Sequence, residues 1–322
     1  LCLPAQAAAE KKIIMRYSHS SAAMVEEPHH TAALDFKKYV EEKTKGRVEV
    51  QIYPASQLGG EERAFQDVQQ GVIQIASLAS NNAAVFAPSL YVIDLPYLFR
   101  TNQEGWTILD KYWDELNAKT IKESGNRIIG WLDLGYRHVC NSKRPIRTIE
   151  DLKGLKIRVP NNPIMIGVYR AWGTDPVPMA MDETFNALQQ KVVDGQDNPL
   201  VSIATNRFYE VQKYITEIHY KVWIGPIVVN AAWFKKQPAD VQKAILEGGR
   251  LATENNRKMI AEMETDLVKV LKDKGVEILA KPEDEPVWQE KAMAVWPQFY
   301  DKIGDISLLD TMMKSLGRTR PQ

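Results

Sequence analysis

Residues 48–78, VEVQIYPASQLGGEERAFQDVQQGVIQIASL, contain the pattern that decides the fold. Val48–Tyr53 alternates apolar and polar residues with period two, which predicts a strand. Residues 61–70 have helical spacing and end at Gly71, and residues 72–78 form a second strand pattern. A strand, a helix and another strand in this order indicate a layered α/β domain.

The same order of elements extends in both directions from this stretch. The patterns predict further strands at residues 12–17, 127–132, 137–141, 155–159 and 222–230, and further helices at residues 31–44, 107–124, 163–172 and 182–191. A helical pattern of about 35 residues then covers residues 238–274, which at 1.5 Å per residue is about 50 Å long. Such a helix could run across two domains. Residues after 308 read as a basic, frayed tail.

Length and composition limit the classes of protein to which the chain can belong. The chain has 322 residues, which suggests about two domains. Lys plus Arg is 41 and Asp plus Glu is 41, so the net charge is zero and no nucleic-acid partner is expected. Two cysteines, Cys2 and Cys140, are too few for a disulfide framework or a four-thiolate zinc site. The longest charge-free stretch, residues 68–93, contains too many polar residues for a membrane helix.

The first ten residues, LCLPAQAAAE, read as the end of a secretory signal peptide. An apolar end is followed by small residues at A-x-A spacing and then by charged residues. The alternative is a disordered Ala-rich tag. On the first reading we expect a secreted protein, from which cleavage removes Cys2 and leaves Cys140 as a lone thiol.

Motifs for catalysis and cofactors are absent from the sequence. There is no G-x-G-x-x-G after an early strand, no G-x-x-x-x-G-K-[ST], no H-E-x-x-H and no G-x-S-x-G. The histidine pair His29-His30 would need a distant partner to bind a metal, so we expect a helix start with one histidine toward a cleft. We therefore expect no catalytic residues, no metal and no cofactor.

Residues 131–199 hold the candidate binding groups. Strand alternation puts Arg158 on the face opposite Ile157 and Val159, where it is either a solvated charge or a guanidinium that binds a carboxylate through two hydrogen bonds. Arg137 is a second cation for the same anion or an ordinary surface charge. Residues 193–199 form a polar turn, which either caps a helix or leaves the amide of Asn198 to donate to a ligand.

Five stretches in order resemble one family of proteins. They are YPASQLGG (53–60), DLPYLF (94–99), DLKGLKIRVP (151–160), VDGQDNP (193–199) and FYEVQK (208–213). The chain resembles the substrate-binding proteins of TRAP (tripartite ATP-independent periplasmic) transporters, of the C4-dicarboxylate-binding type, over about residues 12–304. The resemblance implies a periplasmic protein that delivers a small organic acid to a membrane permease.

The resemblance also implies the architecture. We expect an α/β, two-lobed periplasmic-binding-protein clamshell with a long helix bridging both lobes. Residues 1–10 would be the signal peptide remnant, residues 11–134 plus 225–262 the first lobe, residues 135–224 plus 263–308 the second lobe and residues 309–322 the tail. We expect a monomer that does not span the membrane.

Roles of individual residues follow from the resemblance as expectations. Arg158 would form the ion pair with the ligand carboxylate, assisted by Arg137, and Asn198 would donate to the ligand. The further candidates are Asn161, Asn81, Asn82 and His30. Residues 79–82 lack the Glu and Arg of sialic-acid-binding members, so that ligand is not expected.

The ligand class rests on the expected lining. Cations beside several asparagines suit one carboxylate and several hydroxyls, because buried polar groups need partners. Trp131 and Trp223 could cover a sugar ring, although each could equally be a core residue. We therefore expect a sugar acid such as a uronate. The alternatives are an aromatic 2-oxo or amino acid and a C4-dicarboxylate.

Two other classes of protein stay open at this point. A secreted enzyme acting on a carboxylate would need a general base beside Arg158. His138 is the nearest candidate, but alternation turns it away from Arg137. A sensor-associated binding module of the same fold would differ only in its partner.

Overall fold

A computed structural model describes residues 12–322, with only the backbone described at residues 264 and 265. Its strands form one mixed sheet in the order β2-β1-β3-β9-β4-β7-β5-β6, with β8 beside β4 and β10 beside β8. The strands are β1 (Ile13–Ser18), β2 (Val48–Tyr53), β3 (Ile75–Ser77), β4 (Asn126–Asn141), β5 (Lys156–Val159), β6 (Asp175–Pro178), β7 (Gly195–Pro199), β8 (Tyr214–Thr216), β9 (Val222–Asn230) and β10 (Glu277–Leu279).

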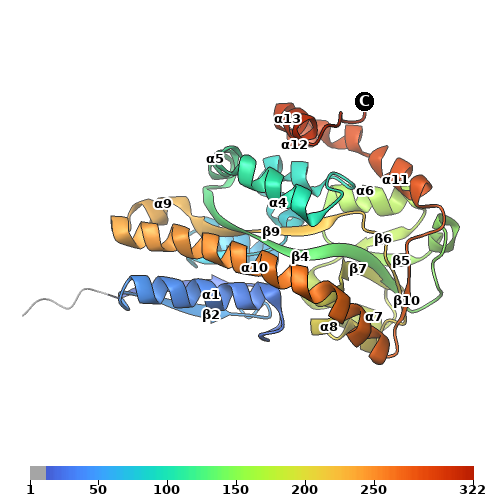
Figure 1. Cartoon of the computed structure of the whole chain (residues 1–322), viewed down its shortest axis with the longest axis horizontal. Helices are drawn as coiled ribbons and strands as arrows, with labels where there is room; N and C mark the ends of the chain where they lie inside the picture. The colour runs from blue at the N-terminus through green and yellow to red at the C-terminus, as the bar shows by residue number, and fades with distance from the viewer. Residues whose placement is uncertain (1–11) are drawn as a thin grey trace, which may run out of the picture.

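Helices cover both faces of this sheet (Figure 1). The α-helices are α1 (Pro28–Lys43), α2 (Glu61–Gln69), α3 (Ser80–Ala83), α4 (Asn102–Lys111), α5 (Trp113–Ser124), α6 (Pro163–Ala171), α7 (Met181–Gln189), α8 (Leu200–Thr205), α9 (Ala231–Lys235), α10 (Ala239–Asp273), α11 (Glu285–Met293), α12 (Tyr300–Ile303) and α13 (Ser307–Ser315). The 3-10 helices are η1 (Pro88–Asp94), η2 (Ile149–Leu152), η3 (Phe208–Glu210) and η4 (Trp296–Phe299).

The sheet consists of two similar halves. The first lobe is built on β1-α1-β2-α2-β3-α3 and the second on β5-α6-β6-α7-β7-α8. In each lobe the first strand lies between the other two and pairs with them in parallel. The antiparallel strands β9 and β4 lie between the two sets and join them. This arrangement confirms the predicted two-lobed α/β class, while the exact lobe boundaries remain a prediction.

Strand β4 runs unbroken from one lobe into the other. The sequence predicted two separate strands here, at residues 127–132 and 137–141. Instead, the register against β9 shifts between Asp133 and Tyr136, and Gly135 takes a φ of +88°. An irregularity of this kind absorbs extra residues and bends the strand without ending it. The bend lies where β4 leaves its partner β9 and begins to pair with β7 and β8.

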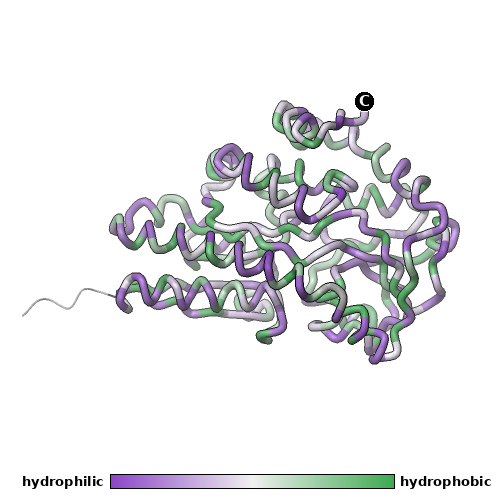
Figure 2. The backbone as a smooth tube through the Cα atoms, viewed as in Figure 1, coloured by the Kyte–Doolittle hydropathy of each residue, from purple (hydrophilic) through white to green (hydrophobic). Residues whose placement is uncertain are grey.

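The long helix α10 spans both lobes, as the sequence predicted. Its 35 residues contact α1 and β4 and continue to α8 and β10 (Figure 1). Figure 2 shows polar and apolar residues alternating along it, as expected of a helix with one buried face. At Gly249 a Cβ atom would lie 2.0 Å from the carbonyl oxygen of Ile129, so only glycine lets the helix lie this close to β4.

The C-terminal segment corrects one expectation. Residues 309–322 were predicted to be a frayed tail because of their basic composition. Instead, α13 is a helix whose Leu309 and Met312 are completely buried. Their spacing puts them on one helical face, which packs into the largest apolar cluster. A short apolar stripe therefore outweighed the basic composition.

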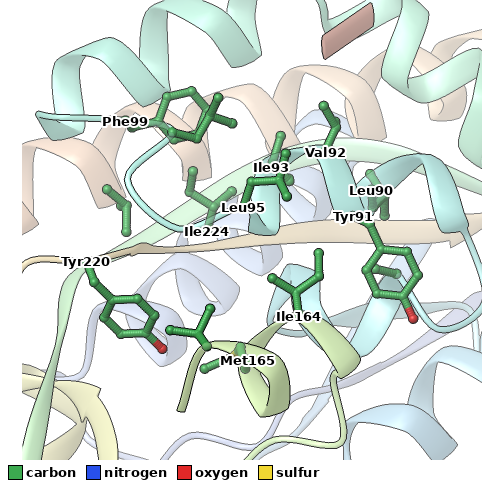
Figure 3. Close-up of a cluster of buried hydrophobic side chains, with 14 of the residues drawn as sticks. Leu90, Tyr91, Val92, Ile93, Leu95, Phe99, Ile164, Met165, Tyr220 and Ile224 are labelled. Carbon is green, nitrogen blue, oxygen red and sulfur yellow. The ribbon is translucent and has the colours of Figure 1, made fainter. Parts of the chain in front are cut away.

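The largest apolar cluster connects the lobes from within. Figure 3 shows Leu90 and Ile93 of η1 together with Ile164 and Met165 of α6. All four belong to the same buried cluster, although η1 follows the first lobe and α6 lies in the second.

The predicted helix at residues 107–124 is divided into α4 and α5 at Tyr112.

Candidate functional site

A cleft between the two lobes contains most of the predicted binding residues. Its walls come from the loop after β1, the start of α2, helix α3, the middle of β4, the end of β5, the start of α7, and β7, α8 and β9. The lining residues are Ser20, Ser21, Glu61, Ala79, Asn81, Asn82, Leu134, Arg137, Arg158, Pro160, Met181, Asn198, Ser202, Asn206 and Trp223.

Arg158 lies on β5 with its guanidinium in the cleft. Its Nε and Nη2 donate to the carbonyl oxygen of Met179, at 3.0 and 2.7 Å. This contact holds one edge of the guanidinium, and no hydrogen bond or ion pair from Nη1 is formed within residues 12–322. Burial, together with the positive charge of Arg137, lowers the pKa of Arg158 to about 10. A buried cation without a counter-ion is costly, so this position favours an anionic ligand.

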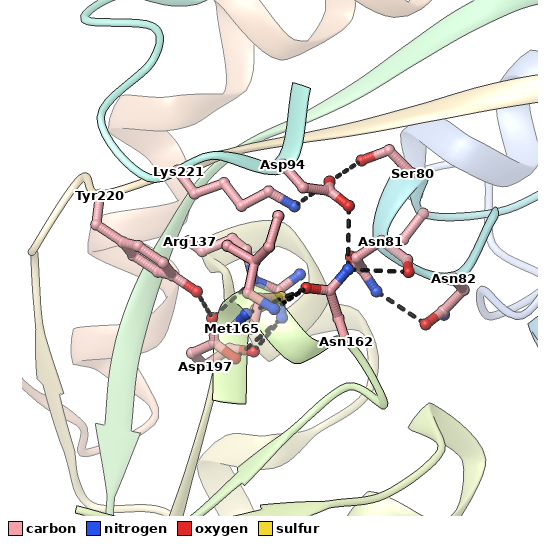
Figure 4. Close-up of polar contacts among 12 residues, drawn as sticks. Ser80, Asn81, Asn82, Asp94, Arg137, Asn162, Met165, Asp197, Tyr220 and Lys221 are labelled. Carbon is pink, nitrogen blue, oxygen red and sulfur yellow. Dashed lines mark hydrogen bonds and ion pairs between the residues drawn. The ribbon is translucent and has the colours of Figure 1, made fainter. Parts of the chain in front are cut away.

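Arg137 lines the same cleft, but its charge is already paired. Its Nε lies 2.7 Å from Oδ2 of Asp197, and its Nη2 donates to Oδ1 at 3.1 Å and to the carbonyl oxygen at 2.7 Å. Burial lowers the pKa of Arg137, but the adjacent carboxylate outweighs it and raises the pKa overall. Tyr220 Oη also donates to Asp197, at 2.5 Å (Figure 4). Arg137 therefore holds Asp197 beside the cleft and adds little net charge to the cleft.

Asn198 lies on β7 and faces the cleft, as its lining position shows. The sequence predicted that its amide would be free to donate. Nδ2 donates one of its two hydrogens to Oε1 of Gln196 at 2.6 Å and lies 3.7 Å from the sulfur of Met181. Donation to a ligand therefore stays a prediction, and Oδ1, which no described donor reaches, can also accept from a ligand hydroxyl.

Asn81 and Asn82 form the first-lobe wall together with an acidic residue that the sequence analysis missed. Asn81 Nδ2 donates to Oδ1 of Asn82 at 2.8 Å, and Asn82 Nδ2 donates to Oε2 of Glu61. Ser20 Oγ donates to Oε1 of Glu61 at 2.5 Å. A Gly-Gly-Glu sequence after a predicted strand could have pointed to Glu61, because such residues begin a helix at the strand end.

The two candidate tryptophans lie in different places. Trp223 lines the cleft and packs against His29, with ring centroids 5.6 Å apart. Trp131 does not line the cleft: it is 1% exposed, lies in the apolar core and meets Trp113 edge to face. Its position on β4 turns it toward α5, so only Trp223 offers a flat apolar surface to a ligand.

His30 and Asn161 also lie away from the cleft lining. His30 Nδ1 is 3.0 Å from Nε2 of His19. Asn161 is exposed and contacts Glu62 outside the inner cleft. Its neighbour Asn162 turns inward instead and caps α6 by accepting from the backbone N–H groups of its first turn. Asn162 is therefore the residue whose side chain reaches the first lobe, while a ligand contact of Asn161 stays a prediction.

Asn162 also bridges the two lobes. Its Nδ2 donates to the carbonyl oxygen of Asn81 and to Oδ2 of Asp94, both at 3.1 Å (Figure 4). Asp94 in turn pairs with Lys221 at 2.7 Å and accepts from Ser80 at 2.6 Å. Burial lowers the pKa of Lys221, and the carboxylate of Asp94 opposes that shift. This network holds the cleft-lining helix α3 against η1 and the start of α6.

Membrane-spanning helices and metal-binding clusters are both absent from the described residues. From residue 12 onward, no helix combines the length and apolar character needed to cross a membrane. Over the same residues, no three His, Cys, Asp or Glu side chains are grouped so that they could hold a metal ion.

The titratable side chains of the cleft lining are Glu61, Arg137 and Arg158. This lining suits the binding of an anion with several hydrogen-bonding groups.

Comparison with known proteins places the chain in a family. Residues 19–303 match the family model described as bacterial extracellular solute-binding protein, family 7. The 2,3-diketo-L-gulonate-binding periplasmic protein YiaO of Escherichia coli is 32% identical over 251 residues, which are 78% of this chain and 76% of that protein.

Two solved structures are similar in shape. A TRAP periplasmic solute-binding protein from Rhodobacter sphaeroides, described as apo, open and partially disordered, is 38% identical with a TM-score of 0.79, covering 95% of this chain and 99% of that one. The sugar acid binding protein DctPAm from Advenella mimigardefordensis, in complex with galactonate, is 27% identical with a TM-score of 0.89 over the same shares. This chain thus has the higher TM-score with the galactonate-bound protein, despite the lower identity. The chain belongs to family 7 of the bacterial extracellular solute-binding proteins and is a substrate-binding protein of the TRAP transporter type.

Proposed function

We propose that this chain captures the monoanion of a sugar acid, with a uronate favoured, and delivers it to the membrane permease of a TRAP transporter. The observation that carries the proposal is the charge pattern of the cleft. Arg158 is buried and forms no ion pair within the described residues, whereas Arg137 is paired with Asp197. One guanidinium edge suits one carboxylate, bound through two parallel hydrogen bonds.

The neutral part of the lining supports a polyhydroxylated ligand. Asn81, Asn82 and Asn198 offer amide groups, and Ser20 and Ser202 offer hydroxyls. A ligand with several hydroxyls would satisfy these groups once closure excludes water. The galactonate complex of DctPAm and the name of the Escherichia coli relative point to the same ligand class.

The two alternative ligands fit this lining less well. An aromatic acid would use two tryptophans as a sandwich, but of the two candidates only Trp223 lies among the lining residues. A C4-dicarboxylate would bring two negative charges to a cleft in which Arg137 is already paired. Both ligands remain arms of the test below.

The proposal includes binding without chemistry. Catalysis on a bound acid would need a base or nucleophile next to Arg158. His138 does not line the cleft and packs against His219, with ring centroids 4.7 Å apart. We expect the bound acid to be released unchanged after the lobes open, by a hinge motion of the kind that binding proteins use. Secretion to the periplasm through a signal peptide at residues 1–10 belongs to the same proposal, and those residues lie outside the described part.

A thermal-shift series tests the ligand class. One sample is titrated in parallel with D-galacturonate, D-glucuronate, D-galactonate, succinate, indole-3-acetate and phenylpyruvate. A ligand at 100 times its Kd stabilises the folded state by about 2.7 kcal/mol, which is readily seen as a shift in Tm. We expect the sugar acids to give the largest shifts and NMR to recover them intact. A shift with aryl acids or succinate alone would overturn the proposed ligand class.

A further inference from the structure

Glu61 is held in the cleft wall by three donors. It is the first residue of α2 and follows Gly60, which has no side chain to cap the helix. Oε1 accepts from Ser20 at 2.5 Å, and Oε2 accepts from the backbone N–H of Ala79 at 3.1 Å and from Asn82. These contacts come from two segments of the first lobe, the loop after β1 and the start of α3. The direction of the carboxylate is therefore fixed before any ligand enters.

The charge of Glu61 is not neutralised by an ion pair with any described cation. The donors that hold it are a hydroxyl, an amide and a backbone N–H, all of which are neutral. Its negative charge acts on Arg158, which lines the same cleft. The cleft therefore has one positive wall in the second lobe and one negative wall in the first.

We propose that Glu61 sets the specificity of the cleft by accepting hydrogen bonds from ligand hydroxyls and rejecting a second carboxylate. This inference rests on the proposed function, since it concerns the end of the sugar acid that is away from Arg158. A carboxylate has about four lone-pair sites, so contacts with three donors leave room for a ligand hydroxyl. Glu61 has no proton to offer a second carboxylate, which would meet it as a like charge.

Two acids that differ at one carbon test this inference. D-galactonate and galactarate share a six-carbon chain and its internal hydroxyls, but galactarate has a carboxylate where galactonate has a terminal hydroxyl. Calorimetry measures both Kd values for the wild type, for Glu61→Gln and for Glu61→Asp. Glu62→Gln is the matched control, because Glu62 lies in the same first turn of α2 and contacts Asn161 outside the inner cleft.

The expected result is a change in the ratio of the two Kd values. The wild type and Glu61→Asp bind galactonate at least tenfold more tightly than galactarate, because like charges face each other in the galactarate complex. Glu61→Gln lowers that ratio about tenfold or more, while Glu62→Gln leaves it within about twofold. Melting curves of each variant without ligand show whether it is folded.

Several outcomes separate this inference from the proposed function. If Glu61→Gln weakens both acids equally, Glu61 only supports Asn82 and Ser20, and the inference is wrong while the proposed function stands. A wild type that binds galactarate as tightly as galactonate contradicts the inference. This comparison uses no variant, so the inference can be tested even if Glu61→Gln does not fold. A wild type that binds neither acid and none of the other sugar acids overturns the proposed function and this inference together.

Discussion

Arg137 and Asp197 form a buried ion pair beside the cleft, with 2.7 Å between Arg137 Nε and Asp197 Oδ2. Both side chains are almost completely buried, and Tyr220 adds a hydrogen bond to the same carboxylate oxygen. Because β4 and β7 pair with Arg137 opposite Pro199, the sheet register itself brings the two charges together. Arg137 is therefore paired within the protein, whereas Arg158 forms no ion pair with a described residue.

Removing one member of this pair is expected to destabilise the fold. Asp197→Asn leaves the Arg137 guanidinium buried without its counter-charge, and breaking a buried pair in this way costs about 3–5 kcal/mol. The free energy of unfolding in urea measures the effect. Glu150→Gln is the control, since it removes one member of the exposed Lys153–Glu150 pair and should change stability by less than about 0.5 kcal/mol. Equal effects of the two substitutions would contradict the assigned role of Asp197.

Lowering the pH below 6.5 is expected to destabilise the protein through its buried histidines. Burial lowers the pKa of His19 to about 2 and that of His29 to about 3. Both pKa values are below the ordinary 6.5, so the unfolded state binds more protons and stability falls as the pH drops below 6.5. Well below 6.5, each histidine contributes a slope of about 1.4 kcal/mol per pH unit.

Glu27 is expected to act with the opposite sign. Burial raises the pKa of Glu27 from 4.5 to about 7, so the folded state holds an extra proton between these values, and stability from this group is lost as the pH rises. Glu27→Gln removes this term while keeping an acceptor for the backbone N–H of His30. Urea unfolding from pH 5 to 7 should therefore show a steeper gain of stability with pH in the variant than in the wild type. An unchanged slope would show that Glu27 is ionised in the folded protein.

The contact between α10 and β4 is expected to tolerate no side chain at Gly249. In Gly249→Ala the new Cβ would lie 2.0 Å from the carbonyl oxygen of Ile129, so the helix or the strand must move. Overpacking of this kind costs about 1–3 kcal/mol, more than the roughly 1 kcal/mol that alanine gains over glycine within a helix. Gly105→Ala in α4 is the control, because its Cβ would meet Phe99 at an ordinary 3.5 Å. We expect thermal unfolding to give a lower Tm than the wild type for Gly249→Ala but not for Gly105→Ala.

Asn162 is expected to couple the stability of α6 to ligand affinity. Asn162→Ser keeps a helix-capping oxygen but is too short for the contacts with Asn81 and Asp94, each of which is worth about 0.5–1.5 kcal/mol. We expect a small loss of stability and roughly a tenfold loss of affinity for the sugar acid, measured by calorimetry. Affinity equal to that of the wild type would mean that these contacts do not help to form the binding cleft.

Local patterns predicted most of the longer strands and helices and the strand face of Arg158, whereas the anion-binding role of Arg158 was implied by the family resemblance and stays a prediction. Alternation around Arg158 and the helical pattern that became α10 are visible without knowledge of the fold. Glu61 and Asp197 were missed because their roles depend on which segments meet across the sheet and the cleft. The bridging role of Asn162 was missed because the sequence does not show which of two adjacent asparagines caps α6. Trp131 could not be told from a cleft residue by its strand position alone.

The direct test of the central claim is the affinity of Arg158→Ala for the tightest sugar acid, measured by calorimetry beside the wild type. Truncating one partner of a buried charge pair costs about 2–5 kcal/mol, so the Kd should rise at least thirtyfold while the protein remains folded. Arg158→Lys should also bind more weakly, because an ammonium cannot form two parallel hydrogen bonds with a carboxylate. Arg170→Ala is the matched control, since Arg170 is an exposed residue of α6, and its Kd should equal that of the wild type. A Kd for Arg158→Ala equal to that of the wild type would contradict the account.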